Sequence, residues 1–307
     1  MSFKIGVDGG GTKTECILVN AEGTVVAVHV GTGCNPSVVG PEQARSIVTA
    51  ALNSLRAQAN AHTAGLTRTP FGPAPEISET LLCMAGSRGF WGEFAEKLNG
   101  FGKITALDDS LPVLELATNG KAGLVLHAGT GSFVAARGSD NSVHYAGGLG
   151  WRFGDPGSGY DIGQRAVARG LVELQGWAPP SRLGALLREH TGLATAQEIT
   201  RSFYADPASN QKIAELTPAL LRLASEGDQN AQQIIFQSVA GLVDLAGRVA
   251  EKLFPSSRPD TVRAGLSGPI LTHPLVMQAI ATRSSLAFAP VEGKPIEGVR
   301  RLLDNKR

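Results

Sequence analysis

The sequence predicts an α/β protein of two domains, the second of which begins like the first. The chain has 307 residues, more than a single hydrophobic core usually supports. A strand, a glycine-rich turn and a second strand open the chain, and the same succession recurs at residues 123–137. Apolar-periodic stretches typical of helices lie between and after the strands. We therefore expect a duplicated fold rather than one continuous core.

The first half is predicted to open with three short strands at residues 3–7, 15–19 and 24–28. Tight turns separate these strands, which indicates antiparallel pairing. A helix, a connection rich in Pro, Gly and Thr, and two more strands are predicted next, at about residues 42–61, 65–75, 80–85 and 104–107. This half thus combines a meander with alternating helix and strand.

The second half begins with predicted strands at residues 123–128 and 133–137. Most of the remainder is apolar-periodic and therefore helical, including a stretch from about 229 to 253 that Pro255 ends. A short strand and a closing helix are predicted at 261–264 and 296–303. The expected domains are 1–118 with the C-terminal helix 293–307, and 119–292.

Composition narrows the class of protein. A content of 42% hydrophobic and 18% charged residues with a net charge of +1 is typical of a globular protein and gives no reason to expect nucleic acid. The first eight residues lack the apolar stretch of a secretory signal, so a cytoplasmic location without a membrane anchor is expected. The three cysteines and six histidines show no metal-ligand spacing and are interpreted as ordinary thiols and as surface or packing residues.

Asp8 leads into the first glycine turn, residues 9–13, which lies between two predicted strands. Glycines there permit positive φ and let backbone N–H groups approach an anion, so the turn is predicted to bind phosphate. No helix follows it, which excludes the P-loop and the dinucleotide fingerprint. The alternative is a glycine-rich hairpin without a ligand, but Asp8, Thr12 and Lys13 add groups suited to a metal and to phosphates.

A second glycine turn, residues 129–132, stands at the equivalent place in the second half, and two such turns can hold a triphosphate between domains. Asp109 ends a predicted strand before it and is placed to deprotonate an attacking hydroxyl, as in phosphoryl transfer. The alternative for Asp108, Asp109 and Ser110 is the N-cap and acidic first turn of a helix. Both roles can coexist.

Five motifs in order carry a resemblance to a known family: D-G-G-G-T-K-T, D-D-S, G-T-G-S, G-G-L-G-W-R-F-G-D-P-G-S-G and G-L-S-G-P. Over nearly its whole length the chain resembles N-acetylglucosamine kinases and BadF/BadG-type ATPases, within the wider group of sugar kinases, actin and heat-shock ATPases. The G-D-P-G-S-G block is the most specific. The resemblance implies two actin-like, ribonuclease H-like domains, each with a mixed five-stranded sheet and flanking helices, and an ATP cleft between them.

The resemblance also implies roles for individual residues. ATP phosphates would be held by Gly9, Gly10, Gly11, Thr12, Lys13, Gly129, Thr130, Gly131 and Ser132. The adenosine side would contact Gly227, Ser267 and Gly268, and the sugar would contact Asn35, Asp109, Gly148, Leu149, Asp155 and Gly159. Asp109 would be the general base, and Asp8 would help to bind Mg²⁺, mainly through water. A turn residue before Pro36 is the alternative for Asn35.

The expected reaction is transfer of the γ-phosphoryl group of Mg-ATP to the 6-hydroxyl of N-acetylglucosamine, with glucosamine as the nearest alternative. Leu149 replaces the Trp of animal N-acetylglucosamine kinases, and Asp108 replaces the usual Asn, so that either neighbouring carboxylate could act. The competing functions are a BadF-type ATPase that activates a dehydratase or reductase and a regulator without catalysis. Isolated cysteines argue against the iron–sulfur cluster of such activators. A homodimer is expected because related kinases form one.

Overall fold

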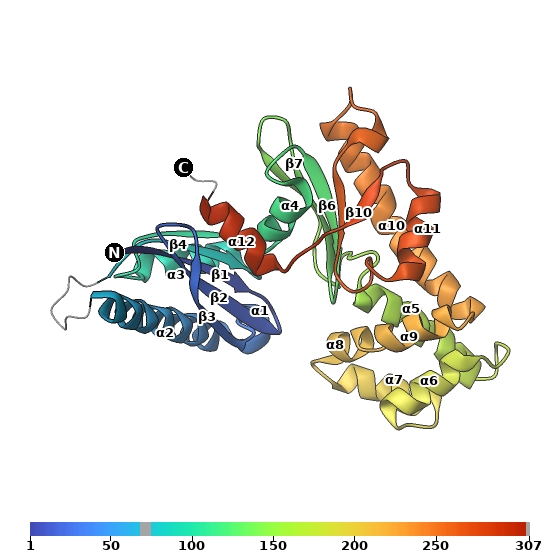
Figure 1. Ribbon diagram of the computed structural model, residues 1–307. Helices are drawn as coiled ribbons and strands as arrows, with labels where there is room; N and C mark the ends of the chain where they lie inside the picture. Colours follow the sequence, from blue (N-terminus) through green and yellow to red (C-terminus); the bar gives the residue numbers. More distant parts are fainter. Residues whose placement is uncertain (68–74, 305–307) are drawn as a thin grey trace. The chain divides into compact units, whose positions relative to one another are not determined.

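The computed structural model describes residues 1–67 and 75–304 and divides into two compact units. The first unit is Met1–Gly120 together with the segment from Glu292, and the second is Lys121–Val291 (Figure 1). Of the connection predicted at 65–75, residues 68–74 lie outside the described residues. Among the described residues, no helix combines the length and apolar character needed to cross a membrane.

The first unit is built on a sheet with strand order β3-β2-β1-β4-β5. Strands β1, β2 and β3 form the predicted antiparallel meander, and β4 and β5 run parallel to β1. The strands are β1 (Ser2–Gly9), β2 (Lys13–Asn20), β3 (Val25–Thr32), β4 (Glu76–Met84) and β5 (Lys103–Asp108), and the helices are α1 (Pro36–Val39), α2 (Pro41–Thr67), α3 (Arg88–Lys97), α4 (Ser110–Thr118) and α12 (Pro295–Asp304).

Helices cover both faces of this sheet because its central strands are apolar on both sides. Cys16 and Leu18 of β2 pack in the same core as the apolar face of α2, whereas Ile17 and Val19 pack against α12. A period of two sends successive side chains of a strand to opposite faces. Helix α12 therefore belongs to the core of the first unit although it lies at the far end of the chain, beside β1 and β2.

The second unit repeats this plan with strand order β10-β9-β6-β7-β8, in which β6, β7 and β8 are antiparallel and β9 and β10 run parallel to β6. Its strands are β6 (Gly123–Ala128), β7 (Ser132–Arg137), β8 (Val143–Gly147), β9 (Ala264–Ser267) and β10 (Phe288–Pro290). Its helices are α5 (Gly159–Leu174), α6 (Arg182–Thr191), α7 (Ala196–Ala205), α8 (Ser209–Ala214), α9 (Thr217–Ser225), α10 (Gln229–Leu253), α11 (Pro274–Arg283) and the short 3₁₀ turn η1 (Pro259–Thr261).

The long helix α10 packs across β6, β7 and β8, and helices α5 to α9 form a helical group within the same unit. The predicted strand at 261–264 was placed too early: η1 ends at Thr261, and β9 begins at Ala264. The difference has a physical cause, since Pro259 begins a 3₁₀ turn that Arg258 closes by accepting a hydrogen bond from the N–H of Thr261.

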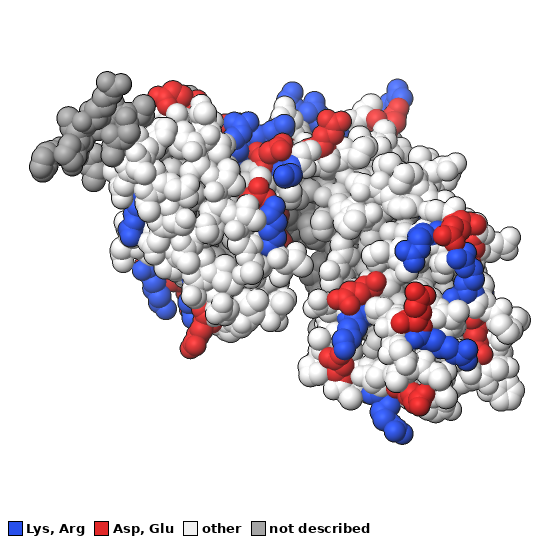
Figure 2. Space-filling model, turned by 60° about the horizontal axis from the view of Figure 1, so that its bottom comes forward, with Lys and Arg blue, Asp and Glu red and all other residues white. Residues whose placement is uncertain are grey.

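The predicted fold class of two mixed five-stranded sheets with flanking helices is confirmed. Cys16, Cys34 and Cys83 are buried free thiols. On the face drawn in Figure 2, Lys and Arg side chains are interspersed with Asp and Glu over both units, as expected for a net charge of +1.

Candidate active site

The first glycine turn closes the β1–β2 hairpin and is exposed from Gly11 to Lys13. The N–H of Gly10 donates to the carbonyl of Lys13, and the carbonyl of Gly10 accepts from the N–H of Cys34. A Cβ at Gly33 would lie 2.0 Å from the carbonyl oxygen of Gly11, so only glycine lets the chain pass this close. The turn is therefore held from behind by the segment after β3, while its outer side is open to a ligand.

Asp8 lies directly before this turn, at the end of β1. Burial, with a smaller effect of the Glu15 carboxylate, raises the pKa of Asp8 from 3.8 to about 6, although Lys13 opposes the shift. The ammonium group of Lys13 forms an ion pair with Glu15. Lys13 is predicted to contact phosphate, and a bound phosphate would therefore compete with the Glu15 carboxylate for the Lys13 ammonium group.

Asp108 and Asp109 follow β5 and have different environments. Oδ1 of Asp108 accepts hydrogen bonds from the N–H of Ser110 at 3.1 Å and from its hydroxyl, and Oδ2 lies 3.3 Å from the guanidinium of Arg88. Asp109 occupies the N-cap position of α4 but makes no side-chain capping bond. The capping role considered for this pair therefore falls to Asp108, which turns its carboxylate back toward Ser110.

The carboxyl group of Asp109 has a strongly raised pKa. Burial is the main reason that its pKa rises from 3.8 to about 7, and the nearby carboxylates of Asp108 and Asp8 raise it further. The parallel register places Asp8 beside Cys83, and Met84 beside Asp108. Three carboxyl groups thus gather at one edge of the first sheet, as expected for the carboxyl ends of parallel strands.

The second glycine turn closes the β6–β7 hairpin in the second unit. Its backbone is held by helix α5, since the N–H of Gly159 donates to the carbonyl of Gly129 at 2.7 Å and the N–H of Tyr160 donates to that of Thr130 at 3.4 Å. Thr130 is exposed, but Ser132 is buried and its hydroxyl donates to the carbonyl of Pro156. Ser132 therefore anchors the turn through its side chain.

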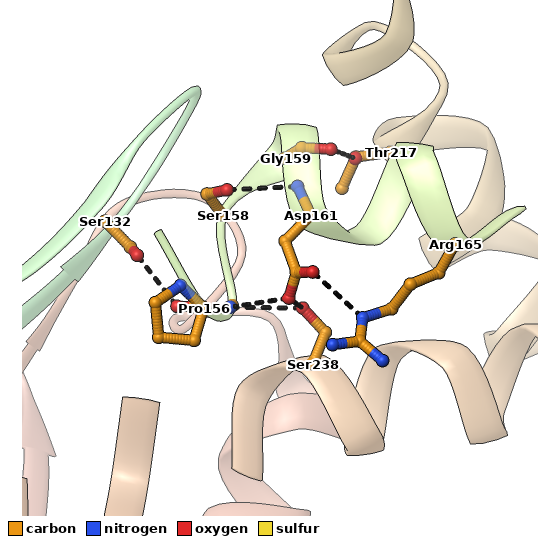
Figure 3. Close-up of polar contacts among 9 residues, drawn as sticks. Ser132, Pro156, Ser158, Gly159, Asp161, Arg165, Thr217 and Ser238 are labelled. Atoms are coloured by element: carbon orange, nitrogen blue, oxygen red, sulfur yellow. Dashed lines mark hydrogen bonds and ion pairs between the residues drawn. The ribbon is translucent and has the colours of Figure 1, made fainter. Parts of the chain in front are cut away.

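The G-D-P-G-S-G block is fixed by polar contacts that Figure 3 shows. Ser158 caps α5 by accepting from the N–H of Asp161, and the hydroxyl of Ser238 in α10 donates to the Asp161 carboxylate at 2.5 Å. Arg165 pairs with the same carboxylate at 2.9 Å, and Thr217 of α9 donates to the carbonyl of Gly159 at 2.9 Å. Three helices therefore brace the loop that supports the second glycine turn.

Sequence reasoning did not identify Asp161, Ser238 or Thr217, nor the ion pair that Arg88 makes with Asp108. Asp161 lies within the first turn of a helix that follows Ser158, a signal that could have been read as a capping pattern. Ser238 and Thr217 carry no such signal, because each lies in a separate helix and meets the loop only in the folded chain.

Asp155, predicted to contact the sugar, is buried beside the second glycine turn. Its Oδ1 accepts from the N–H of Gly150 at 3.2 Å, and a Cβ at Gly131 would lie 3.0 Å from its Oδ2. Burial raises its pKa, an effect opposed by hydrogen bonds from the backbone of Gly150 and Ser132. The carboxylate therefore binds the loop to the turn.

The other predicted sugar contacts differ in exposure. Gly148 has φ of 66°, and the side chain of Leu149 after it is 68% exposed. Gly159 is buried, and the room left by its missing side chain lets α5 approach Gly129. Asn35 caps α1 by accepting from the N–H of Ser37 at 3.0 Å, which agrees with the turn role considered for it.

The residues predicted for the adenosine side lie in the second unit. Gly227, with φ of 90°, connects α9 to α10. Ser267 ends β9, and Gly268 follows with φ of 88°, where a Cβ would lie 2.2 Å from the carbonyl oxygen of Ala128. Ser267 and Gly268 thus lie against the end of β6, next to the second glycine turn.

The carboxylates of the first unit suit Mg²⁺. Asp8 offers hard oxygen donors of the kind that Mg²⁺ binds, and a cation beside this buried carboxyl group would oppose the rise in its pKa. Within residues 1–67 and 75–304, no group of three or more His, Cys, Asp or Glu side chains is arranged to hold a metal ion by itself.

Comparisons with known proteins agree on one family. The sequence profile described as "BadF/BadG/BcrA/BcrD ATPase family" matches residues 5–265. An N-acetyl-D-glucosamine kinase of Dictyostelium discoideum is 28% identical over 81% of this chain and 79% of its own length. The glucosamine kinase GspK of Vibrio cholerae is 27% identical over 96% of this chain and 97% of its own. The crystal structure of a candidate N-acetylglucosamine kinase from Chromobacterium violaceum aligns with a TM-score of 0.74 at 26% identity, covering 98% of both chains.

Proposed function

Because this chain belongs to the BadF/BadG/BcrA/BcrD ATPase family, we propose that it is an ATP-dependent kinase that phosphorylates the 6-hydroxyl of N-acetylglucosamine. The resemblance read from the five motifs is confirmed by the match to residues 5–265. The similar kinases of Dictyostelium discoideum and Vibrio cholerae, both named as acting on an amino sugar, support a sugar phosphotransferase.

The observation that carries this proposal is the difference in environment between the carboxyl groups of Asp108 and Asp109. Asp108 is engaged by Ser110 and Arg88, whereas Asp109 makes no capping bond and has a pKa of about 7 because it is buried beside other carboxylates. A general base works best when its pKa lies near the operating pH. Asp109 therefore accepts the proton of the attacking sugar hydroxyl, and Asp108 fixes the start of α4.

Both glycine turns contribute to ATP binding in this proposal. Phosphoryl transfer depends mainly on positioning and on donors directed at the phosphate oxygens, and backbone N–H groups of the exposed turns are such donors. Asp8 would hold Mg²⁺ through water, and the metal would neutralise charge on the phosphates. Bound phosphate would draw Lys13 from its ion pair with Glu15.

Glucosamine is a second candidate acceptor, which a specific observation favours. GspK, named a glucosamine kinase, matches 96% of this chain, compared with 81% for the N-acetyl-D-glucosamine kinase. An acetamido group is neutral, whereas a free amine is largely cationic and would be attracted to a carboxylate.

A different observation favours N-acetylglucosamine. Leu149 and Phe153, which are 68% and 82% exposed, offer apolar surface that suits an acetyl methyl group.

ADP release by the purified protein with Mg-ATP tests the proposal. The panel contains N-acetylglucosamine, glucosamine, N-acetylmannosamine, glucose and no sugar. We expect strong stimulation by N-acetylglucosamine; phosphate incorporation at the 6-position is then read by NMR of the product. Stimulation by glucosamine alone would select the alternative, and sugar-independent hydrolysis would favour an ATPase that activates another enzyme. The expected homodimer and cytoplasmic location stay predictions.

A further inference from the structure

His127 occupies the position in the second unit that Asp8 occupies in the first. Each residue lies in the second-to-last residue pair before its glycine turn: Asp8 is paired with Glu15, and His127 is paired with Phe133. On its other side each is paired with the parallel strand that follows in the sheet, Asp8 with Cys83 and His127 with Ser267. The duplicated sheet thus presents a carboxylate before one glycine turn and an imidazole before the other.

The imidazole of His127 has a defined set of neighbours. Its Nδ1 lies 3.2 Å from the hydroxyl oxygen of Ser267, within hydrogen-bonding distance. Its ring stacks on Phe133 with centroids 5.0 Å apart and planes inclined by 19°. Its Nε2 lies 3.4 Å from the position that a Cβ at Gly129 would take. One ring therefore contacts the return strand β7 and the end of β9, and it leaves little room for a side chain at Gly129 of the second glycine turn.

The backbone brings the same segments together. A Cβ at Gly268 would lie 2.2 Å from the carbonyl oxygen of Ala128, so the chain after β9 passes directly over the end of β6. The two strands are aligned along four residue pairs that end at His127 and Ser267. The contact between these two side chains therefore connects β6 and β9 at their last residue pair, directly before the turn that follows each strand.

We propose that His127 is a positioning residue for the nucleotide: its bond to Ser267 and its stacking on Phe133 hold the second glycine turn and the Ser267–Gly268 turn in one fixed arrangement. The inference rests on the proposed function, in which the first of these turns contacts ATP phosphates and the second contacts the adenosine side. A ligand that contacts both turns binds more weakly when the turns move relative to each other, because ordering them on binding costs conformational entropy.

The ring acts as a neutral group. Burial lowers the pKa of His127 from 6.5 to about 4, so it carries no charge near neutral pH. A neutral imidazole has one N–H donor and one acceptor, and either tautomer can bond to the Ser267 hydroxyl, which both donates and accepts. His127 therefore supplies shape and a hydrogen bond where Asp8 supplies charge.

Two substitutions at His127 separate the hydrogen bond from the bulk of the ring. His127→Phe keeps an aromatic ring to stack on Phe133 and removes the bond to Ser267. His127→Asn removes the ring but retains a polar group near the place of Nδ1. We expect His127→Phe to weaken binding of Mg-ADP and raise the KM for ATP about 5- to 10-fold, the loss of one hydrogen bond, and His127→Asn to recover at least part of it. The KM for the sugar should stay constant.

Calorimetric titration of each variant with Mg-ADP is the decisive measurement, with His144→Phe, an exposed histidine on β8 of the same sheet, as the matched control. Ser267→Ala removes the other end of the hydrogen bond, and the His127→Phe, Ser267→Ala double variant should lose no more affinity than Ser267→Ala alone. Ser267→Ala also serves if His127→Phe does not fold.

The outcomes are distinguishable. If the unaltered protein binds no nucleotide, the proposed function fails and this inference fails with it. If the unaltered protein binds Mg-ADP but His127→Phe binds it equally well, or if the losses of the two single variants add, the inference alone is overturned. A lower melting temperature with an unchanged nucleotide affinity would assign His127 to packing, which also overturns it.

Discussion

The two units use the same backbone device for different chemistry. In each, an antiparallel hairpin carries a glycine turn, and a parallel strand lies beside its first strand. A glycine of another segment lies close against each hairpin: Gly33, which follows β3, against Gly11 in the first unit, and Gly268, which follows the parallel strand β9, against Ala128 in the second. The side chains at the strand ends differ. The first sheet gathers Asp8, Asp108 and Asp109, whereas the second presents His127 and Ser267.

The difference lies at the strand ends: neighbouring carboxyl groups gather there in the first unit, whereas the buried carboxylate of the second unit, Asp155, belongs to the loop before α5. Burial is the main reason that the pKa values of Asp8 and Asp109 rise to about 6 and about 7. Glu15 raises the pKa of Asp8 further, and Asp108 and Asp8 raise that of Asp109. Burying a carboxyl group opposes its ionised form and costs stability, and strongly raised pKa values cluster at functional sites. At the corresponding strand ends of the second unit, the side chains of His127 and Ser267 are neutral.

The largest effect is expected from removing the proposed base. Asp109→Asn should lower kcat by roughly 10²- to 10⁴-fold, the usual contribution of a general base, with the KM for the sugar little changed. Its neighbour provides the matched control: Asp108→Asn should cost about 1 kcal/mol of stability through the weakened cap and retain most of the turnover. Steady-state kinetics of both variants decides the matter, and equal losses of kcat would reject the assignment of the base to Asp109.

The glycines behind the two hairpins should have the next largest effect. Gly33→Ala and Gly268→Ala would place a Cβ 2.0 Å and 2.2 Å from backbone oxygens, so the turns must shift. We expect ATP efficiency, kcat/KM, to fall by about 10²-fold in each, since displacements near 1 Å can cost that much. Gly92→Ala in α3 and Gly247→Ala in α10 meet open space and serve as controls in the two units. A normal kcat/KM in one variant would show that its unit does not position ATP.

The acidity of the first unit should appear in the pH profile. The kcat/KM for the sugar reports the free enzyme, so it should fall about tenfold per pH unit below pH 7, where Asp109 is protonated and cannot accept a proton. Protonation of Asp8 below pH 6 should steepen the fall. The residual activity of Asp109→Asn should lack the step near pH 7; the same step in the variant would assign it to another group.

The same pKa shift predicts the reverse trend for stability. The carboxyl group of Asp109 titrates at about 7 in the folded chain and near 3.8 when unfolded, so its contribution to stability is fully present below pH 3.8 and is lost as the pH rises through 7. Asp109→Asn, which has no charge to bury, should therefore gain in melting temperature relative to the unaltered protein between pH 5 and pH 8. A melting-temperature difference that is independent of pH would contradict the shift.

The smallest effect is expected from removing the hydrogen bond between α9 and the G-D-P-G-S-G block of the second unit. Thr217→Val removes the hydrogen bond to the carbonyl of Gly159 at constant shape and should cost about 1 kcal/mol of unfolding free energy. Ser225→Ala, which removes a bond within α9, is the matched control in the same helix. Denaturant melts give the stability, and a change in ATP KM specific to Thr217→Val would show that the brace also reaches the nucleotide site.

Local patterns predicted the hairpins well, because strand alternation and glycines act over a few residues. The meander and both glycine turns follow from such patterns. Boundaries were less well predicted where a tertiary contact extends an element: β3 continues to Thr32, beyond the expected end at residue 28, because it pairs with β2 along its whole length. Helix α3 was not predicted, and its Trp91 and Phe94 are buried in the first core.

The sequence by itself determined the duplicated plan, the family and the set of carboxylates and glycines from which a site can be built. Only the tertiary structure decided how they are used: that Arg88 and Ser110 engage Asp108, that Ser238 bonds to Asp161 and that Ser267 meets His127. The last two pairs are separated by 77 and 140 residues, respectively. Such contacts leave no periodic trace in the chain, because they depend on which strands and helices become neighbours when the core is buried.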